Sequence, residues 1–91
     1  MRFLYTVWFR DPTKPADDQD YEWPACFMVD APAARQAAAW GDRLASSYAT
    51  RTGQQFLSST VETLERADLP GTDELPVIVF GHEATDKEIG W

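Results

Sequence analysis

The feature that most constrains this fold is a single long helical segment in the middle of the chain, between Pro32 and Gly53. Proline suits the first turn of a helix, where its absent N–H group has no partner to lose, and Asp30 or Ala31 is the predicted N-cap. No proline recurs before Pro70, and Gly53 predicts a helix end in the left-handed conformation. A chain of 91 residues suits one small domain, so the sequence predicts a single domain over residues 1–91 with one main helix.

This helix has one face of small and apolar side chains when its residues are placed 100° apart. The face consists of Ala34, Ala37, Ala38, Gly41, Leu44, Ala45 and Tyr48. Because these side chains have little bulk, the helix backbone can lie close to its partner layer, and larger side chains from that layer fill the remaining space. The pattern predicts a helix that packs on one face of a sheet.

Two segments before the helix alternate with the period of two that is typical of strands. Residues 3–10 and 23–29 are rich in aromatic and apolar side chains, and Pro24 predicts an edge position or a bulge near the start of the second strand. Between them, residues 11–21 contain two prolines and four acidic side chains, a composition that predicts a long loop. A strand, a loop and a second strand favour an antiparallel pair.

The segment after the helix is ambiguous between helix and strand. Leu57, Val61 and Leu64 have helical spacing, and Ser59 with Glu62 fits a capping box. The run of serine, threonine and valine favours a strand instead, and a short link after a long helix commonly returns the chain to the sheet. We expect a third strand over residues 55–64.

The C-terminal part contains a turn, a strand and a short helix in the predicted arrangement. Pro70 and Gly71 mark the turn, and the apolar run from Leu75 to Phe80 predicts the fourth strand. The tail over residues 85–91 has the composition of one capped helical turn. The predicted fold is therefore α+β, a small two-layer sandwich of order ββαββ, with one amphipathic helix on a mainly antiparallel four-stranded sheet.

One helix can cover only one face of such a sheet, and the other face is unusually apolar. The predicted helix-facing residues are Phe3, Tyr5, Val7, Phe9, Trp23, Ala25, Phe27 and Val29, which places Leu4, Thr6, Trp8, Cys26 and Met28 on the opposite face. Exposed apolar patches on small proteins usually mark an interaction surface. The predicted interface residues are Leu4, Trp8, Cys26 and Met28, with Trp40 as a flank and Trp91 from the tail. The alternative is that the tail, with Ile89 and Trp91, folds over this face.

The net charge of −7 argues against nucleic acid and anionic membranes as partners. Residues 61–91 carry eight acidic and two basic side chains, which favours either a solvated surface or a basic protein partner. The apolar N-terminal segment is too short to span a membrane, and a single cysteine requires no oxidising compartment. We expect a cytoplasmic protein.

Signals for catalysis or metal binding are weak. Asp17, Asp18, Asp20 and Glu22 suggest a calcium loop, but the spacing places Trp23 where such a loop needs glycine. His82 with Glu83 follows the fourth predicted strand and is a candidate ligand-binding pair, and Cys26 with His82 is a candidate thiolate and base. A structural role is the simpler interpretation of each, so no catalytic residue, metal or cofactor is predicted.

These observations favour a small acidic noncatalytic protein-binding module or homo-oligomeric adaptor, with a homodimer as the expected form. The first alternative is an acidic inhibitor of a basic protein, similar in its action to an immunity protein or an antitoxin. The second alternative is a ligand-binding domain or small enzyme centred on His82 and neighbouring carboxylates, at a pocket formed by the loop over residues 11–21.

Overall fold

The computed structural model describes residues 1–63 and 75–91 of the chain. Its elements are β1 (Arg2–Arg10), β2 (Glu22–Asp30), α1 (Ala34–Thr52), β3 (Gln55–Thr63), β4 (Val77–Val79) and α2 (Asp86–Ile89). This order confirms the predicted α+β fold with the arrangement ββαββ. The predicted turn at Pro70 and Gly71 and the last residue of the predicted third strand lie outside the described residues. No helix among the described residues is long and apolar enough to cross a membrane.

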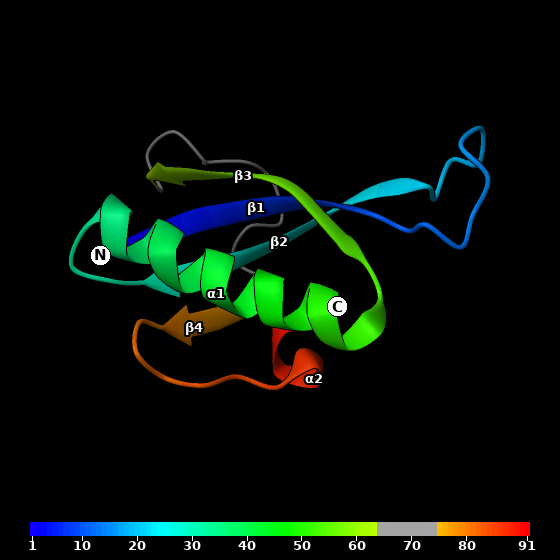
Figure 1. Ribbon diagram of the computed structural model, residues 1–91. Coiled ribbons are helices and arrows are strands. Elements are labelled where there is room, and N and C mark those ends of the chain that lie inside the picture. The colour runs from blue at the N-terminus through cyan, green and yellow to red at the C-terminus, as the bar shows by residue number, and fades with distance from the viewer. Residues whose placement is uncertain (64–74) are drawn as a thin grey trace.

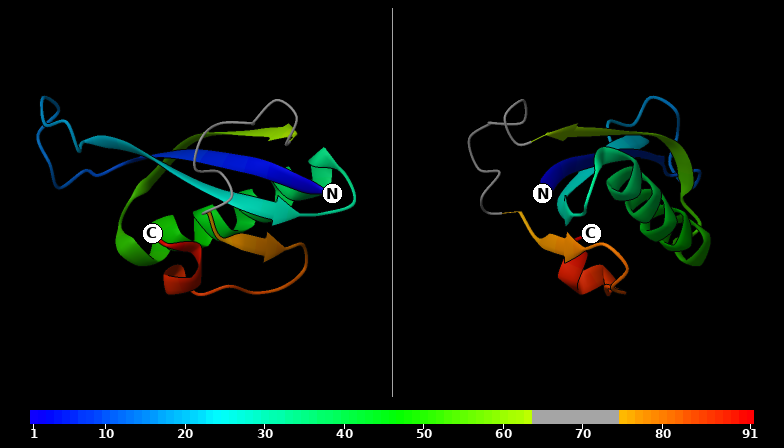
Figure 2. Two further views of the ribbon diagram at one scale, coloured as in Figure 1. Left: turned by 180° about the vertical axis from the view of Figure 1, so that it is seen from behind. Right: turned by 90° about the vertical axis from the view of Figure 1, so that its left-hand side faces the viewer.

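The four strands form one mixed sheet of order β3-β1-β2-β4, with α1 across one face (Figure 1). β1 pairs antiparallel with β2 and with β3, whereas the short β4 pairs parallel with β2. The loop between β1 and β2 projects away from the body of the molecule, as Figure 1 and the left view of Figure 2 show. The sheet is mainly antiparallel, as predicted, with one parallel edge strand.

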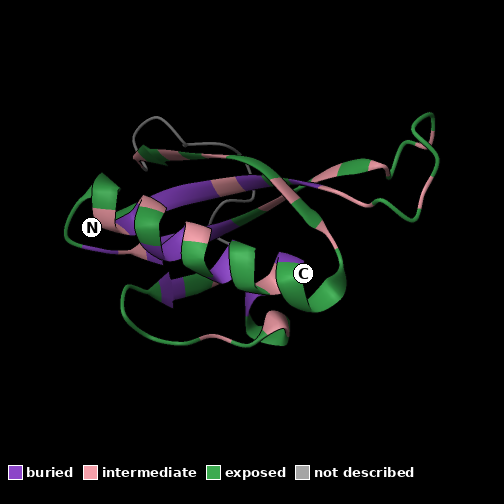
Figure 3. Cartoon of the chain, viewed as in Figure 1, coloured by how far each residue is buried: buried purple, intermediate pink, exposed green. Residues whose placement is uncertain are grey.

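The face of the sheet beneath α1 carries the main core. Most residues of β1, the strand at the centre of this face, are buried (Figure 3). The strand residues of this core are Phe3, Tyr5, Val7, Phe9, Phe27, Val29 and Ile78, and Trp23 and Ala25 pack against it. These residues alternate along β1 and β2 with those of the opposite face, because successive side chains of a strand point to opposite sides. The predicted division of the first two strands between the two faces is confirmed.

The start of α1 differs from the prediction. Its N-cap is Ala33, which makes no side-chain capping hydrogen bond, so neither Asp30 nor Ala31 caps the helix and Pro32 precedes the first turn. Asp30 remains the last residue of β2, opposite Arg2, and the chain needs the next residues to turn back over the sheet. At the other end, Gly53 has a φ of 75° and ends the helix in the left-handed conformation, as predicted.

The small residues of α1 allow a close approach to the sheet, and Gly41 lies directly against Tyr5 of β1. A Cβ atom at this position would overlap the ring of Tyr5. The buried residues of α1 are Ala37, Trp40, Gly41, Leu44, Ala45 and Ala49, so Trp40 belongs to the buried face and Ala34 is exposed. Trp40 lies at the border of the predicted face, where Phe80 packs against it with a centroid distance of 5.8 Å.

Other predictions for the strands are confirmed with shifted boundaries. β3 covers residues 55–63, so the strand interpretation of that segment is correct. β4 is shorter than predicted and covers only Val77–Val79. Because β4 pairs with Met28–Asp30 alone, Pro24 lies in a part of β2 that has β1 on one side and no described strand on the other.

The C-terminal tail forms the predicted capped turn but covers a different surface. Thr85 accepts a hydrogen bond from the backbone of Glu88, whose side chain returns one to the Thr85 backbone, so the capping box of α2 is complete. Ile89 is buried in the main core, and Trp91 packs against that core beside Phe9. The tail therefore closes the helix-facing core, and the alternative in which it covers the opposite face is wrong.

Candidate functional site

The outer face of the sheet, opposite α1, holds the first candidate site. On β1, Trp8 lies opposite Pro24 of β2 and Ser58 of β3. Thr6, the preceding outer residue, lies opposite Cys26 and Thr60, and its hydroxyl is 3.5 Å from the Cys26 Sγ atom. We call the exposed set of Trp8, Pro24, Cys26, Ser58 and Thr60 the Trp8 patch.

Trp8 is the prominent member of this patch, with 43% of its surface exposed. It lies on a strand with hydrogen-bonded neighbours on both sides, so its backbone is held in place. Its cross-strand neighbours are a proline and a serine, which are too small to cover an indole ring. The patch thus presents a large apolar side chain on a rigid platform of small uncharged residues.

Leu4 and Met28 lie on the same face but do not contribute to its exposed surface. They form a separate small core, 6% and 3% exposed, against which Leu75 packs. Both residues lie on the outer face, as predicted, but the prediction that they are exposed is wrong. Leu75 is far from both strands in the sequence, so neither strand pattern predicts its contact with these two residues.

Trp40 and Trp91 lie on the other side of the sheet. Trp40 is buried and donates a hydrogen bond from Nε1 to the backbone oxygen of His82, at 3.2 Å. Trp91 stacks on Tyr48 with ring centroids 4.6 Å apart and lies in contact with the main core. The structure therefore does not bring these two tryptophans together with Trp8, and their surroundings lie within the chain itself.

His82 and Glu83 follow β4, at the edge of the sheet. His82 lines an open pocket of about 220 Å³ together with Val77, Ile78, Val79, Glu83, Ala84 and Glu88. Glu83 forms an ion pair with Arg43, at 2.7 Å. No residue of the loop over residues 11–21 lines this pocket, and Cys26 lies on the outer face beside Thr6. The predicted pairings of His82 with that loop and with Cys26 are not formed.

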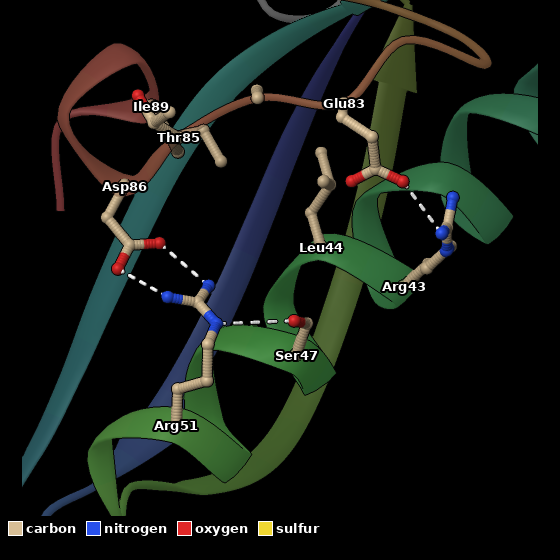
Figure 4. A pocket seen from close by; sticks show the side chains of 9 residues that line it. Arg43, Leu44, Ser47, Arg51, Glu83, Thr85, Asp86 and Ile89 are labelled. Atoms are coloured by element: carbon tan, nitrogen blue, oxygen red, sulfur yellow. Dashed lines mark hydrogen bonds and ion pairs between the residues drawn. The ribbon is translucent and has the colours of Figure 1, made fainter.

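A larger cleft of about 390 Å³ lies between α1 and the C-terminal segment (Figure 4). Two ion pairs flank its apolar floor of Leu44, Ala84 and Ile89. In one pair, the Arg51 guanidinium donates two hydrogen bonds to the two carboxylate oxygens of Asp86, at 2.7 and 2.8 Å. In the other, Arg43 contacts Glu83 and also lies over the ring of Trp40, 4.7 Å from its centroid.

These contacts occupy the charged groups of the cleft. The hydrogen bonds from Arg51, followed by one from the Trp91 indole, lower the pKa of Asp86 below its ordinary value. The same contact raises the pKa of Arg51. Each arginine already has a carboxylate partner, so the cleft offers no uncompensated cation to an anionic ligand. The two ion pairs of the cleft attach the C-terminal segment to α1.

A polar cluster that the sequence analysis missed lies between α1 and the sheet. One carboxylate oxygen of Asp42 accepts hydrogen bonds from the Tyr5 hydroxyl, at 2.7 Å, and from the Ser59 hydroxyl, at 2.6 Å. Burial, together with the Asp42 carboxylate, raises the pKa of Tyr5 far above its ordinary value. Tyr5 lies on β1 and Ser59 lies on β3, so these two hydrogen bonds attach α1 to both strands. The only sequence signal was the place of Asp42 at the border of the small-residue face.

The described residues contain no group of three or more histidine, cysteine, aspartate or glutamate side chains that could hold a metal ion. In the acidic loop, Asp11 accepts hydrogen bonds from the hydroxyl and the backbone of Thr13, which lower its pKa. Asp18 accepts one from the backbone of Asp20. These two carboxylates stabilise turns of the loop, as short acidic side chains commonly do.

The chain was also compared with known proteins. No protein-family model, no curated protein and no solved structure matches it.

Proposed function

We propose that this chain is a noncatalytic protein-binding module that uses the Trp8 patch as its binding surface. The observation that carries the proposal is the 43% exposure of Trp8 in the middle of a sheet whose other large aromatic residues on β1 are buried. Tryptophan is enriched among the residues that dominate binding energy at protein interfaces. A side chain held on a central strand also loses little freedom when a partner covers it.

The chemistry of the Trp8 patch indicates the kind of partner. Its members are uncharged, and the charged pair at its border, Arg10 with Glu22, is internally compensated at 3.3 Å. A partner surface that suits this patch has an apolar side chain to cover the indole and polar groups for the hydroxyls of Ser58 and Thr60. We therefore expect an association that changes little with salt concentration, since salt screens only charged contacts.

The acidic-inhibitor alternative has less support among the described residues. Two carboxylates of the C-terminal third, Glu83 and Asp86, already pair with arginines of α1. A third, Glu88, is engaged in the capping box of α2. The ligand-binding alternative at His82 has a pocket, but both carboxylates that line it already have partners: Glu83 pairs with Arg43, and Glu88 belongs to the capping box. Both alternatives stay predictions.

A photo-crosslinking amino acid, p-benzoylphenylalanine, tests the proposal when it replaces Trp8 in living cells. We expect an adduct at position 8, and its mass separates a second copy, at twice the chain mass of 10.3 kDa, from another protein. The matched control places the same amino acid at Phe80, which is similarly exposed, at 38%, but lies beside β4. Equal adducts at both positions, or none at position 8, would contradict the proposal.

A further inference from the structure

The four tryptophans of this chain differ in how their indole N–H groups are bonded. Three of them donate a hydrogen bond within the chain, at 2.9 to 3.3 Å: Trp23 to the Gln54 side chain, Trp40 to the His82 backbone and Trp91 to the Asp86 side chain. Within residues 1–63 and 75–91, no group accepts a hydrogen bond from the Trp8 indole, and Trp8 alone of the four is exposed. The Trp8 patch therefore offers a partner both an aromatic ring and an N–H donor.

The other polar groups of the Trp8 patch are the hydroxyls of two β3 residues. Ser58 lies opposite Trp8, and Thr60 lies opposite Thr6, the preceding outer residue of β1. Both are exposed, and a hydroxyl can donate to a carbonyl oxygen as the indole N–H does. No member of the patch is charged. A partner that suits this surface therefore carries apolar groups and hydrogen-bond acceptors in place of charges.

The Trp8 patch is too small for a stable contact between two folded proteins. Its five residues, together with Thr6, form two rows across three strands, and the patch ends at Arg10 in one direction and at the buried Leu4 in the other. Since alternate residues of a strand lie about 6.8 Å apart and strands about 4.8 Å apart, the rows cover roughly 200 Å² of the sheet. A stable interface takes about 800 Å² from each folded partner. The size of the patch suits a short segment of a partner chain.

A proline-rich segment in the polyproline II conformation has the chemistry that complements this patch. Proline contributes an apolar ring and no N–H group, and the polyproline II helix has no internal hydrogen bonds, so its carbonyl oxygens can accept from a partner. The proline rings match the Trp8 ring, and the carbonyl oxygens match the indole N–H and the two hydroxyls. Aromatic side chains are the groups on which other small domains bind such segments.

The dimensions of the polyproline II helix also fit the three strands. The helix repeats every three residues, which corresponds to about 9.3 Å. β3 and β2 flank β1 and therefore lie about 9.6 Å apart. A segment that crosses the strands thus passes from the hydroxyls of β3 over Trp8 to Pro24 of β2 in about one turn. Because the helix is preformed, binding costs it little conformational entropy, which allows a contact of this small size to be stable.

We propose that the Trp8 patch binds a proline-rich segment of a partner protein in the polyproline II conformation, laid across β3, β1 and β2. This assignment of the partner rests on the function proposed above, because it names the occupant of the same surface. A charged peptide would find no charged group in the patch to pair with. A second copy of the chain would need contacts that extend far beyond the patch.

Acetylated decaproline amide tests the proposal as a ligand of the full chain, in a titration followed by the indole ¹H–¹⁵N NMR signals. The Trp8 signal, assigned by its loss in Trp8→Phe, should shift with a dissociation constant of about 0.1 to 1 mM. The signals of the other three tryptophans should stay in place. Decaproline built from D-proline is the matched control, because it has the same rings and carbonyl groups in a helix of opposite hand. It should bind at least about tenfold more weakly.

Substitutions within the patch show which groups contribute to binding, with the backbone amide signals of Cys26 and Thr60 as the measurement. Trp8→Ala should raise the dissociation constant at least about tenfold, and Trp8→Phe, which keeps a ring but lacks the N–H donor, about three- to tenfold. Ser58→Ala removes one donor and should raise it about two- to tenfold. Phe80→Ala changes an exposed aromatic residue outside the patch and should bind as the wild type does. Circular dichroism checks that each variant is folded.

The outcomes separate this proposal from the function proposed above. Binding of the L-peptide at Trp8, with at least about tenfold weaker binding of the D-peptide, supports the proline-rich partner. An unmoved Trp8 signal at about 5 mM L-peptide, or equal binding of the two hands, would overturn it. If the crosslinker at position 8 then still forms its specific adduct, the Trp8 patch remains a binding surface with a different occupant. If that adduct is absent as well, both proposals fail.

Discussion

Trp8 and Phe9 are neighbours on β1, yet their surroundings differ as much as any two aromatic residues in the molecule. Phe9 is fully buried and contacts the rings of Trp23, Tyr48 and Trp91. Trp8 is 43% exposed on the outer face. The comparison shows that one helix and one tail suffice to close one face of this sheet, while alternation along the strand places every second side chain on the face that they do not reach.

The largest expected effect comes from truncating the buried member of this pair. Phe9→Ala should lower the free energy of unfolding by about 3 to 5 kcal/mol, because it leaves a cavity among the rings of Trp23, Tyr48, Phe56 and Trp91. Trp8→Ala should lower it by about 1 kcal/mol or less, since the site is open to solvent. Urea denaturation followed by circular dichroism measures both. Similar losses for the two variants would mean that the faces do not differ as described.

Overfilling the closed face should have the next largest effect. Gly41→Ala adds a methyl group where the Tyr5 ring lies, and we expect a loss of about 2 kcal/mol although alanine is the better helix former. The same substitution in a Tyr5→Ala background should cost much less, because the clash is gone. An unchanged cost in that background would show that the close approach of helix and sheet at Gly41 is not the cause.

The polar cluster beneath α1 contributes a smaller and pH-dependent amount. Tyr5→Phe removes the hydrogen bond to Asp42 and should lower stability at neutral pH by about 1 to 2 kcal/mol. The pKa of Tyr5 is higher in the folded protein than in the unfolded chain. Tyr5 therefore contributes its full stabilisation below about pH 10, and this stabilisation declines at higher pH, where the unfolded tyrosine loses its proton.

Urea titrations at pH 9, 10 and 11 measure that decline. The difference in stability between the wild type and Tyr5→Phe should narrow as the pH rises above 10. A constant difference across this range would show that Tyr5 titrates in the folded protein as it does in the unfolded chain.

The smallest expected effect concerns the tail that closes the buried face. Arg51→Gln removes the two hydrogen bonds to Asp86, so the lowered pKa of that carboxyl group should return toward its ordinary value. The pKa of Asp86 is lower in the folded protein than in the unfolded chain. The ion pair therefore stabilises the protein fully above the ordinary pKa of aspartate, and this stabilisation is lost as the pH falls through the folded pKa of Asp86. Carbon NMR of the Asp86 carboxyl group follows the titration.

Arg43→Gln is the matched control for this tail, because it breaks the neighbouring pair with Glu83 and leaves the Arg51 contact in place. The Asp86 titration should then stay as in the wild type. A shift of equal size in both variants would show that the cleft responds to its total charge and not to the direct hydrogen bonds from Arg51.

Local patterns were sufficient to predict most of the fold. The period of two in β1 and β2 assigned their residues to the two faces, and the small-residue face of the helix predicted its packing on the sheet. The predicted start of α1 was wrong because Asp30 pairs with Arg2 of β1 and so remains in β2. The N-cap preference of aspartate does not include this pairing. The burial of Leu4 and Met28 was missed for a similar reason, since their contact with Leu75 joins distant parts of the chain.

The candidate site was predicted less completely. Trp8 and Cys26 were identified as exposed residues of the outer face, which the structure confirms. Trp40 and Trp91 were grouped with them because they are large apolar residues, but a sequence does not show which side of a sheet a helix border or a tail reaches. The Asp42 cluster was not identified, because its three members come from three separate elements.

The sequence by itself determined the order of the elements, the two faces of the first strands and the ends marked by Gly53 and the Thr85 capping box, because each depends on residues within a few positions of one another. Only the tertiary structure decided that the tail closes the helix-facing core, that β4 runs parallel to β2 and that Trp8 stays exposed. These outcomes depend on contacts between segments far apart in the chain, whose free energies no local pattern contains.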